Sequence, residues 1–304
     1  MTAGAADDLP GGALSSFRTA LAARDLTLTA ELPLAPGTAA EDIAAAIGVL
    51  RGRVDAVEIG DNEAASPHLS PLAAAALVLR AGMDPVVHLG CRDRNRIALQ
   101  SELMGAAALG VTSLVLYRGE KLPAGLKQQV RGVFDIGTQR LLATARAVGA
   151  NPRFVAPPGF LLGARVAVLD PPPQWAADGI ATKLAAGASF LQTQPCLDAP
   201  LLGRYARALV ARRVLEKASL IVRVPLLQSL ADLEAARGGR RPLVAPVEAL
   251  ARLRAARDFP AAARALAREM LDEAAGIPGI AGACICGGAP AAVAELLDEA
   301  RRRR

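Results

Sequence analysis

The residues best suited to do chemistry are polar side chains within or at the ends of apolar runs. Glu31 stands inside the apolar run Thr27–Leu34, so a carboxyl group there is partly desolvated. Desolvation raises the pKa of a carboxyl group and keeps a proton available near neutral pH for general acid catalysis. Glu31 is therefore the first candidate for a catalytic residue. The alternative is a structural salt bridge at a strand end.

A second candidate is the turn Arg118-Gly119-Glu120, where a bare glycine backbone lies between a cation and an anion. A residue without a side chain lets a flat ligand approach the backbone closely. The spacing alone fits an ordinary surface turn equally well.

His88 and the cysteines raise the question of a metal site. His88 interrupts an apolar strand, where a lone histidine is more often a hydrogen-bonded core residue than a ligand. Cys284 and Cys286 share a strand face because side chains alternate, and with His88 and Cys91 they could in principle ligate zinc. The spacing matches no known zinc motif, and small thiols commonly fill barrel interiors, so we expect no metal.

These side chains need strands to position them, and short β-rich runs alternate with Ala- and Leu-rich helical stretches. The predicted strands are Thr27–Leu34, Ala56–Gly60, Pro85–Cys91, Ser113–Arg118, Arg153–Pro157, Phe190–Pro195, Ser219–Pro225 and Ala281–Cys286. The predicted helices are Ala40–Arg51, Pro71–Ala81, Arg96–Leu109, Thr138–Val148, Trp175–Ala186, Leu201–Lys217, Pro246–Ala275 and Pro290–Arg304.

Eight strand–helix pairs predict an α/β protein with a single (β/α)8 TIM barrel, which carries its chemistry in the loops after the strands. An open doubly wound sheet is the alternative, but no Gly-x-Gly-x-x-Gly follows the first strand. We assign residues 1–14 to a mobile tail and residues 15–304 to the barrel. The Gly-, Arg- and Pro-rich segment Arg237–Pro246 is expected to form a surface loop.

Composition narrows the classes of partner. Of 304 residues, 52% are hydrophobic but only 3% are aromatic, so few rings are available to stack on the bases of a single-stranded nucleic acid. The net charge of +6 suits an anionic ligand, although the run Arg301–Arg304 also fits a solvated helix end. Four cysteines make no disulfide framework, and neither a signal peptide nor a membrane span is evident. We expect a soluble, cytoplasmic protein.

Three segments, in order along the chain, together resemble the methylenetetrahydrofolate reductase family. The first, Val86–Glu120, has His-Leu at the end of a strand, Arg-Asp-Arg-Asn-Arg-x-Ala-Leu-Gln-Ser opening a helix, and Arg-Gly followed by an acid. The second, Lys183–Asp198, holds a lysine, Ala-Gly-Ala and Thr-Gln; the third, Thr29–Pro36, holds a glutamate followed by prolines. Gly276–Ala283 is a weaker match.

This resemblance implies FAD lying across the barrel top with a folate stacked on its ring. Hydride would pass between flavin N5 and the one-carbon unit, interconverting 5,10-methylenetetrahydrofolate and 5-methyltetrahydrofolate. NAD(P)H or another electron carrier would be the redox partner. A homo-oligomer or a redox partner subunit is also compatible with the sequence.

The resemblance also assigns roles by position. Glu31 matches the family's general acid, Glu120 replaces its usual aspartate beside the pterin and flavin, and Gln194 matches a glutamine that touches folate. Gln228, which follows the seventh strand, is a further candidate for substrate binding. The positions that match flavin contacts are His88, Arg118, Gly119 and Lys183, with Lys183 suited to the phosphates.

Departures from the family pattern leave a second function open. The stretch Gly163–Val168 lacks the motif that commonly helps to hold the flavin after the fifth strand, and Gly287-Gly288 stands where some relatives have an arginine. Arg165 is our hypothesis for a substitute phosphate contact. Because a fold does not fix a function, the alternative is a flavin-free folate-binding methyltransferase component or a non-catalytic subunit of a folate enzyme complex.

Overall fold

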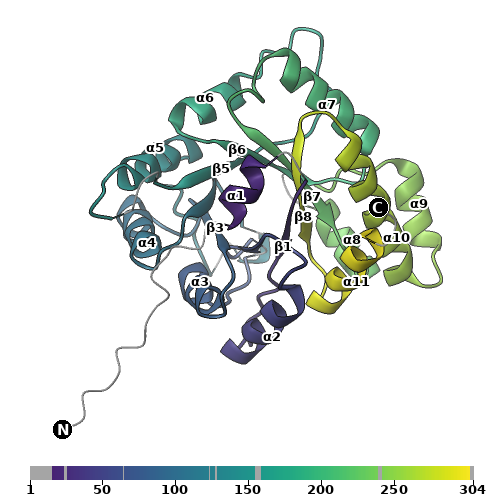
Figure 1. The fold of residues 1–304 in the computed structure, drawn as a ribbon, viewed down its shortest axis with the longest axis horizontal. Coiled ribbons are helices and arrows are strands. Elements are labelled where there is room, and N and C mark those ends of the chain that lie inside the picture. Colours follow the sequence, from purple (N-terminus) through teal and green to yellow (C-terminus); the bar gives the residue numbers. More distant parts are fainter. Residues whose placement is uncertain are drawn as a thin grey trace.

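The computed structural model describes residues 16–23, 26–63, 65–122, 124–126, 129–154, 159–238 and 242–301. Eight parallel strands close into one barrel in sequence order, which confirms the predicted fold (Figure 1). The strands are β1 (Thr27–Glu31), β2 (Ala56–Ile59), β3 (Pro85–Gly90), β4 (Ser113–Tyr117), β5 (Leu161–Arg165), β6 (Phe190–Pro195), β7 (Ser219–Pro225) and β8 (Ile280–Cys286).

Helices surround the barrel and bury the outward-facing residues of the strands beneath them. They are α2 (Ala40–Leu50), α3 (Pro71–Arg80), α4 (Arg96–Ala108), α5 (Thr138–Gly149), α6 (Asp178–Ala186), α7 (Ala199–Ala211), α8 (Leu230–Arg237), α9 (Val247–Ala255), α10 (Phe259–Gly276) and α11 (Pro290–Arg301), with the short 3₁₀ helix η1 (Ala124–Leu126) after β4. Within the described ranges, no helix is both long enough and apolar enough to cross a membrane.

The fifth strand is where the sequence prediction was wrong. We predicted Arg153–Pro157, of which residues 155–157 lie outside the described residues, whereas β5 is Leu161–Arg165. The run Leu-Leu-Gly-Ala-Arg resembled a loop because it contains glycine and lacks β-branched residues. Glycine is required there, because a Cβ at Gly163 would lie 2.2 Å from the ring of Phe190.

Two helical segments also differ from the prediction. The stretch predicted as one helix, Pro246–Ala275, is divided into α9 and α10, because Asp258 caps a new helix by accepting a hydrogen bond from the Ala261 amide at 3.0 Å. Helix α8 was not predicted, and it ends at Arg237, where the predicted surface loop begins. The predicted tail, residues 1–14, lies outside the described residues.

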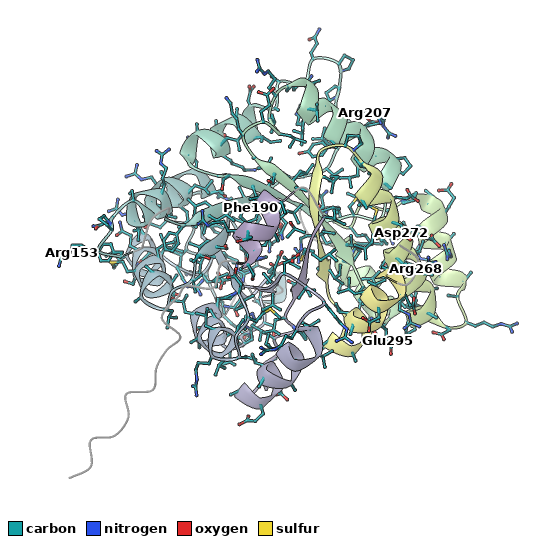
Figure 2. All side chains as sticks on the ribbon, in the orientation of Figure 1. Arg153, Phe190, Arg207, Arg268, Asp272 and Glu295 are labelled. Atoms are coloured by element: carbon teal, nitrogen blue, oxygen red, sulfur yellow. The ribbon has the colours of Figure 1, made fainter. Side chains whose placement is uncertain are left out.

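The N-terminal end of the barrel is closed by α1 (Ser16–Ala22), which lies across the barrel centre in Figure 1. Phe17 is fully buried and meets Phe190 edge to face, with ring centroids 5.4 Å apart. Figure 2 shows Phe190 beside this helix. The other buried members of this bottom layer are Ala56, Val86, Val115, Ile221 and Cys284.

Asp84, one residue before β3, holds α1 in place. Its Oδ2 accepts a hydrogen bond from the Phe17 amide at 2.9 Å, and the Ser16 hydroxyl lies 3.5 Å away. Burial raises the pKa of Asp84 to about 6, although these hydrogen bonds and the nearby Arg18 oppose the rise. The carboxylate is therefore a destabilising form of this residue within the fold.

The Asp84→Asn protein should therefore respond to pH differently from the unchanged protein. The folded pKa lies above the ordinary value of 3.8, so the stability gained from the protonated acid is present below pH 3.8 and lost as the pH rises through about 6. The unchanged protein should lose about 2 kcal/mol of unfolding free energy, relative to the variant, between pH 4 and pH 7. Urea titrations at several pH values measure this difference, and parallel curves for the two proteins would contradict it.

Candidate functional site

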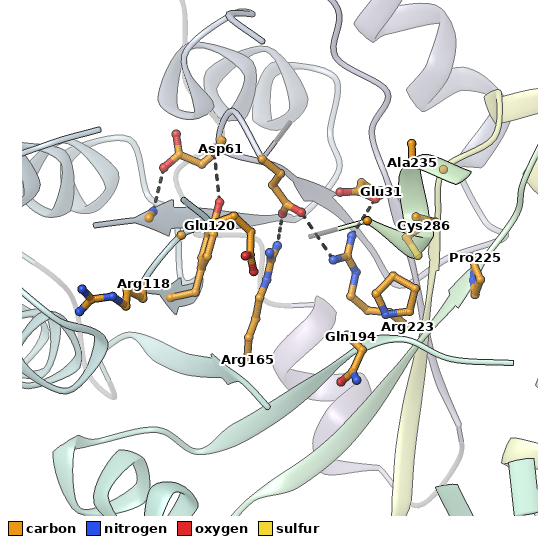
Figure 3. Close-up of a pocket in the computed structure, with 18 of the residues that line it drawn as sticks. Glu31, Asp61, Arg118, Glu120, Arg165, Gln194, Arg223, Pro225, Ala235 and Cys286 are labelled. Atoms are coloured by element: carbon orange, nitrogen blue, oxygen red, sulfur yellow. Dashed lines mark hydrogen bonds and ion pairs between the residues drawn. The ribbon is translucent and has the colours of Figure 1, made fainter. Parts of the chain in front are cut away.

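A cavity of about 650 Å³ opens at the C-terminal ends of the strands (Figure 3). Strand ends and the loops after them line it, which is where a TIM barrel carries its chemistry. Its charged and amide side chains come from most sides of the barrel, and they include Glu31, Glu63, Glu120, Arg165, Gln194 and Arg223.

Four of these side chains form a continuous ion-pair chain in the order Glu31, Arg223, Glu63, Arg165. Arg223 on β7 donates from Nη2 to Glu31 Oε2 at 2.9 Å, and its Nη1 lies 3.7 Å from Glu63 Oε2. Arg165 on β5 pairs with the other oxygen of Glu63. Figure 3 draws this chain across the cavity. The two carboxylates therefore share one guanidinium, so a ligand that moves one of them perturbs the other.

The negative charge of Glu63, at the centre of this ion-pair chain, is stabilised by its contacts with the two arginines. Burial alone would raise the pKa of Glu63, but Arg165 and Arg223 hold it well below its usual range. The Glu63 side chain remains 31% exposed, whereas the side chains of Arg223 and Arg165 are 7% and 11% exposed. The arginines are thus fixed in the barrel wall, and the carboxylate is the member that faces the cavity.

Below the ion-pair chain lies a fully buried polar layer centred on Glu58. Its carboxylate accepts hydrogen bonds from the Thr29 hydroxyl at 2.7 Å, Gln192 Nε2 at 2.7 Å and His88 Nε2 at 2.9 Å. Arg165 Nη2 lies 2.7 Å from His88 Nδ1, and Glu63 Oε1 lies 3.5 Å from the same nitrogen. Burial opposes the charged imidazole, but the hydrogen bonds to Glu58 and Glu63 raise the pKa of His88 above its ordinary value. Burial raises the pKa of Glu58, but the hydrogen bonds from His88, Thr29 and Gln192 bring it to about 2.

The Glu58→Gln substitution would place an amide nitrogen against donors, so it should cost about 3 kcal/mol of unfolding free energy at pH 7. The folded pKa is depressed, so the contribution of Glu58 is present above its ordinary pKa of 4.5 and is lost as the pH falls toward about 2. Denaturant titrations at pH 7 and pH 3 should therefore show the variant and the unchanged protein converging in acid. Glu216→Gln, on the surface, is the matched control, and a loss of stability equal to that control would contradict the assignment.

The loop that carries Glu63 is tied down on its other side. Asp61 Oδ2 accepts hydrogen bonds from the Gly90 amide at 2.8 Å and from Arg94 at 2.7 Å, and the Tyr117 hydroxyl donates to the Asp61 carbonyl at 3.1 Å. Arg92 donates to the carbonyl of Asn62 at 2.6 Å, which holds Asn62 in the left-handed conformation at φ 47°. Glu63 is thus positioned by contacts of β3 and β4 rather than by its own loop.

The structure brings six of the predicted site residues to this cavity: Glu31, Arg118, Gly119, Glu120, Arg165 and Gln194. Gln194 Oε1 accepts a hydrogen bond from the Val168 amide at 2.8 Å, which fixes the orientation of the side chain. Arg165, which we expected in a loop, lies at the end of β5 and points into the barrel.

Three predicted residues are not in the cavity lining. His88 is buried beneath it, with both ring nitrogens engaged. Lys183 on α6 donates from Nζ to the Arg165 carbonyl at 2.8 Å. The Gln228 amide donates to the carbonyls of Leu226 and Leu227 at 3.3 and 3.2 Å. These contacts give all three side chains structural partners.

The turn at Gly119 has the conformation that glycine favours, with φ +86°. A Cβ there would lie 2.8 Å from Arg92 Cβ, so Arg92 already occupies the space beside the glycine. Arg118 is exposed, its guanidinium lies 5.0 Å from the centre of the Phe134 ring, and Figure 3 shows it directed away from Arg165.

The four residues considered as zinc ligands, His88, Cys91, Cys284 and Cys286, do not form a common site. Cys91 faces the surrounding helices, Cys284 belongs to the bottom layer, and burial raises the pKa values of Cys91 and Cys286 to about 11 and about 12. In the part of the chain that the structure describes, no group of three or more His, Cys, Asp and Glu residues could hold a metal ion.

Glu58, Glu63 and Arg223 were not among the predicted site residues. Glu58 carried the same signal as Glu31, a carboxylate in an otherwise apolar strand, and could have been found by it. Glu63 lies in a loop, and its position above the barrel depends on contacts from Arg92 and Tyr117 that no local pattern reveals.

Comparison with known proteins decides the family. The family model described as methylenetetrahydrofolate reductase matches residues 40–274. The chain belongs to this family. No curated protein matches the sequence.

Solved structures of low identity share the fold. A protein from Clostridium thermocellum, described as binding two copies of 5-methyl-5,6,7,8-tetrahydrofolic acid, has 12% identity and a TM-score of 0.67, over 95% of this chain and 100% of that one. Oxaloacetate acetylhydrolase has 13% identity and a TM-score of 0.53, over 96% of this chain and 84% of that one. 2,3-Dimethylmalate lyase has 12% identity and a TM-score of 0.50, over 96% and 85%.

Proposed function

We propose that this family member binds a reduced folate at the mouth of its barrel and handles the one-carbon unit without a flavin of its own, as a methyltransferase component or a subunit of a folate enzyme complex. The observation that carries the proposal is the meeting of Glu31, Glu120 and Gln194 in one cavity, since the resemblance in sequence assigns these positions to the family's folate site. The Clostridium thermocellum protein, described as binding 5-methyltetrahydrofolate on the same fold, supports it.

Three of the cations that could hold the family's flavin have other partners in this chain. The diphosphate of FAD needs cations or backbone N–H groups that are free to bind it. Arg165 is paired with Glu63, Arg92 with Asp93 at 2.6 Å, and Lys183 with a backbone carbonyl. Arg92 packs against one side of the Gly119 backbone, where a Cβ would otherwise lie.

Protons are the part of the chemistry that this chain can supply. In 5-methyltetrahydrofolate the methyl group is bonded to N5, and its transfer to a nucleophile leaves the bonding electron pair on that nitrogen. A proton on N5 makes the nitrogen a better leaving group, which is a task for a carboxylic acid. We assign this task to Glu31, which lines the cavity and would have to take up a proton in place of its ion pair with Arg223.

The second candidate is the flavin-linked reaction of the family, the interconversion of 5,10-methylene- and 5-methyltetrahydrofolate with NAD(P)H or another electron carrier as redox partner. The family match favours it, as does the presence of Arg118, Gly119 and Glu120 in the cavity lining. FAD would supply the hydride chemistry, and the exposed Arg118, which lines the cavity and lies over the Phe134 ring, would be the cation within reach of its diphosphate.

Titration calorimetry with 5-methyltetrahydrofolate tests the folate site. We expect Gln194→Ala to weaken binding about tenfold or more, because it removes a buried amide that would pair with the polar edge of the pterin. Glu216→Gln, on the surface, should bind as the unchanged protein does. If the unchanged protein does not bind this folate, the proposed function is wrong.

The role of Glu31 as a proton carrier is tested by the same titration in buffers of different ionisation enthalpy, near pH 6. The heat should then report protons taken up by the unchanged protein and its folate, and this uptake should vanish in Glu31→Gln while affinity changes less than about tenfold. Equal proton uptake in both proteins would assign the proton to another group.

A further inference from the structure

Two buried guanidinium groups lie close together in the barrel, and the carboxylate between them does not come from a strand. Arg165 lies on β5 and Arg223 on β7, and their side chains converge on Glu63. The positive charge of each opposes that of the other. Barrel strands are rigid, so the two cations stay near one another whatever the loops above them do.

The carboxylate that bridges this pair comes from a loop. Glu63 places one carboxylate oxygen on each arginine and keeps 31% of its side chain exposed to the cavity. A carboxylate bridging two guanidiniums is the arrangement by which proteins bind carboxylate ligands. In this chain the ligand's place is taken by a side chain of the protein itself.

The arginines also have donors to spare. A guanidinium carries five N–H groups, and among the described residues the buried Nε atoms of Arg165 and Arg223 have no hydrogen-bond partner. Glu63, together with Glu31 and His88, therefore leaves part of the donor capacity of this pair unused.

We propose that Arg165 and Arg223 form a binding site for the carboxylate of a small organic acid, and that Glu63 occupies this site until the acid displaces it. The exchange replaces one carboxylate by another, so the buried charge is unchanged and no desolvated cation is exposed at the end of it. The site is deep, beside the buried His88, which suits a small group rather than the diphosphate of a large cofactor.

The remainder of such an acid would extend into the 650 Å³ cavity toward Glu31 and Gln194, which line it. The ligand class is therefore a carboxylic acid of a few carbon atoms whose other end reaches the mouth. This site does not depend on the folate proposal, because Arg165 and Arg223 hold its carboxylate, although the rest of the acid would share the cavity with Glu31 and Gln194.

Acetate is the simplest probe, and chemical rescue is the sharpest test. The substitution Glu63→Ala removes the carboxylate that occupies the site. Acetate should therefore raise the Tm of the variant in a saturable manner, whereas sodium chloride of equal ionic strength should not. Ligand-observed NMR with ¹³C-acetate should give at least tenfold tighter binding to Glu63→Ala than to the unchanged protein, because Glu63 no longer competes. Adding Arg223→Met to Glu63→Ala should abolish both effects.

The surface pair Arg213–Glu216, with 2.8 Å between its charged atoms, provides the control: Glu216→Ala should gain nothing from acetate beyond the effect of salt. If Glu63→Ala does not fold in ordinary buffer, the replacement test is its refolding: recovery of the folded variant in acetate but not in chloride supports the proposal. Equal responses to acetate and chloride would overturn it, as would acetate binding that survives the loss of Arg223. Neither outcome bears on folate binding, which the calorimetry measures separately.

Discussion

The bridging of Arg165 and Arg223 by Glu63 is the interaction on which the upper half of this barrel depends. It allows two arginines to be buried on strands β5 and β7, and it links the strand-end acid Glu31 to the buried layer around Glu58 and His88. A buried guanidinium without a counter-ion would lower the stability of the fold, so Glu63 has to stay in position. Arg92 and Tyr117 provide for this by holding the loop after β2 in place. The same interaction takes up Arg165, the residue that we had hypothesised as a phosphate ligand. Membership of the reductase family is therefore compatible with our proposal of a barrel without a flavin of its own.

Much of the fold was predictable because strand and helix leave strong local patterns. Phe190–Pro195 and Ser219–Pro225 were predicted with the bounds that the structure gives them, since both are apolar runs bounded by helix and turn signals. The strand Leu161–Arg165 was missed because its glycine, which makes room for Phe190, is a tertiary requirement that lowers local strand character. Helix α1, which contains Phe17, was missed for a related reason. A seven-residue helix has little periodicity, and its stability comes from packing across the bottom of the barrel.

The candidate site could be predicted only in part. Residues at the C-terminal ends of strands, such as Glu31, Gln194 and Arg118, reach the cavity because the barrel brings these strand ends together there. His88 and Lys183 were predicted from the family pattern, and in the structure they contact Glu58 and the Arg165 carbonyl and do not line the cavity. Glu63 could not be foreseen, because the loop that presents it is shaped by hydrogen bonds from two other strands and their loops.

The central claim is that this barrel holds a reduced folate and does not hold a flavin. An anaerobic absorbance spectrum tests it most directly: the protein is mixed with FAD, freed of unbound flavin by gel filtration, and examined before and after addition of 5-methyltetrahydrofolate. The account predicts no flavin absorbance in the protein fraction, together with retention of the folate when it is supplied. A flavin spectrum that stays with the protein and bleaches when 5-methyltetrahydrofolate is added would contradict the account and establish the flavin-linked oxidoreductase.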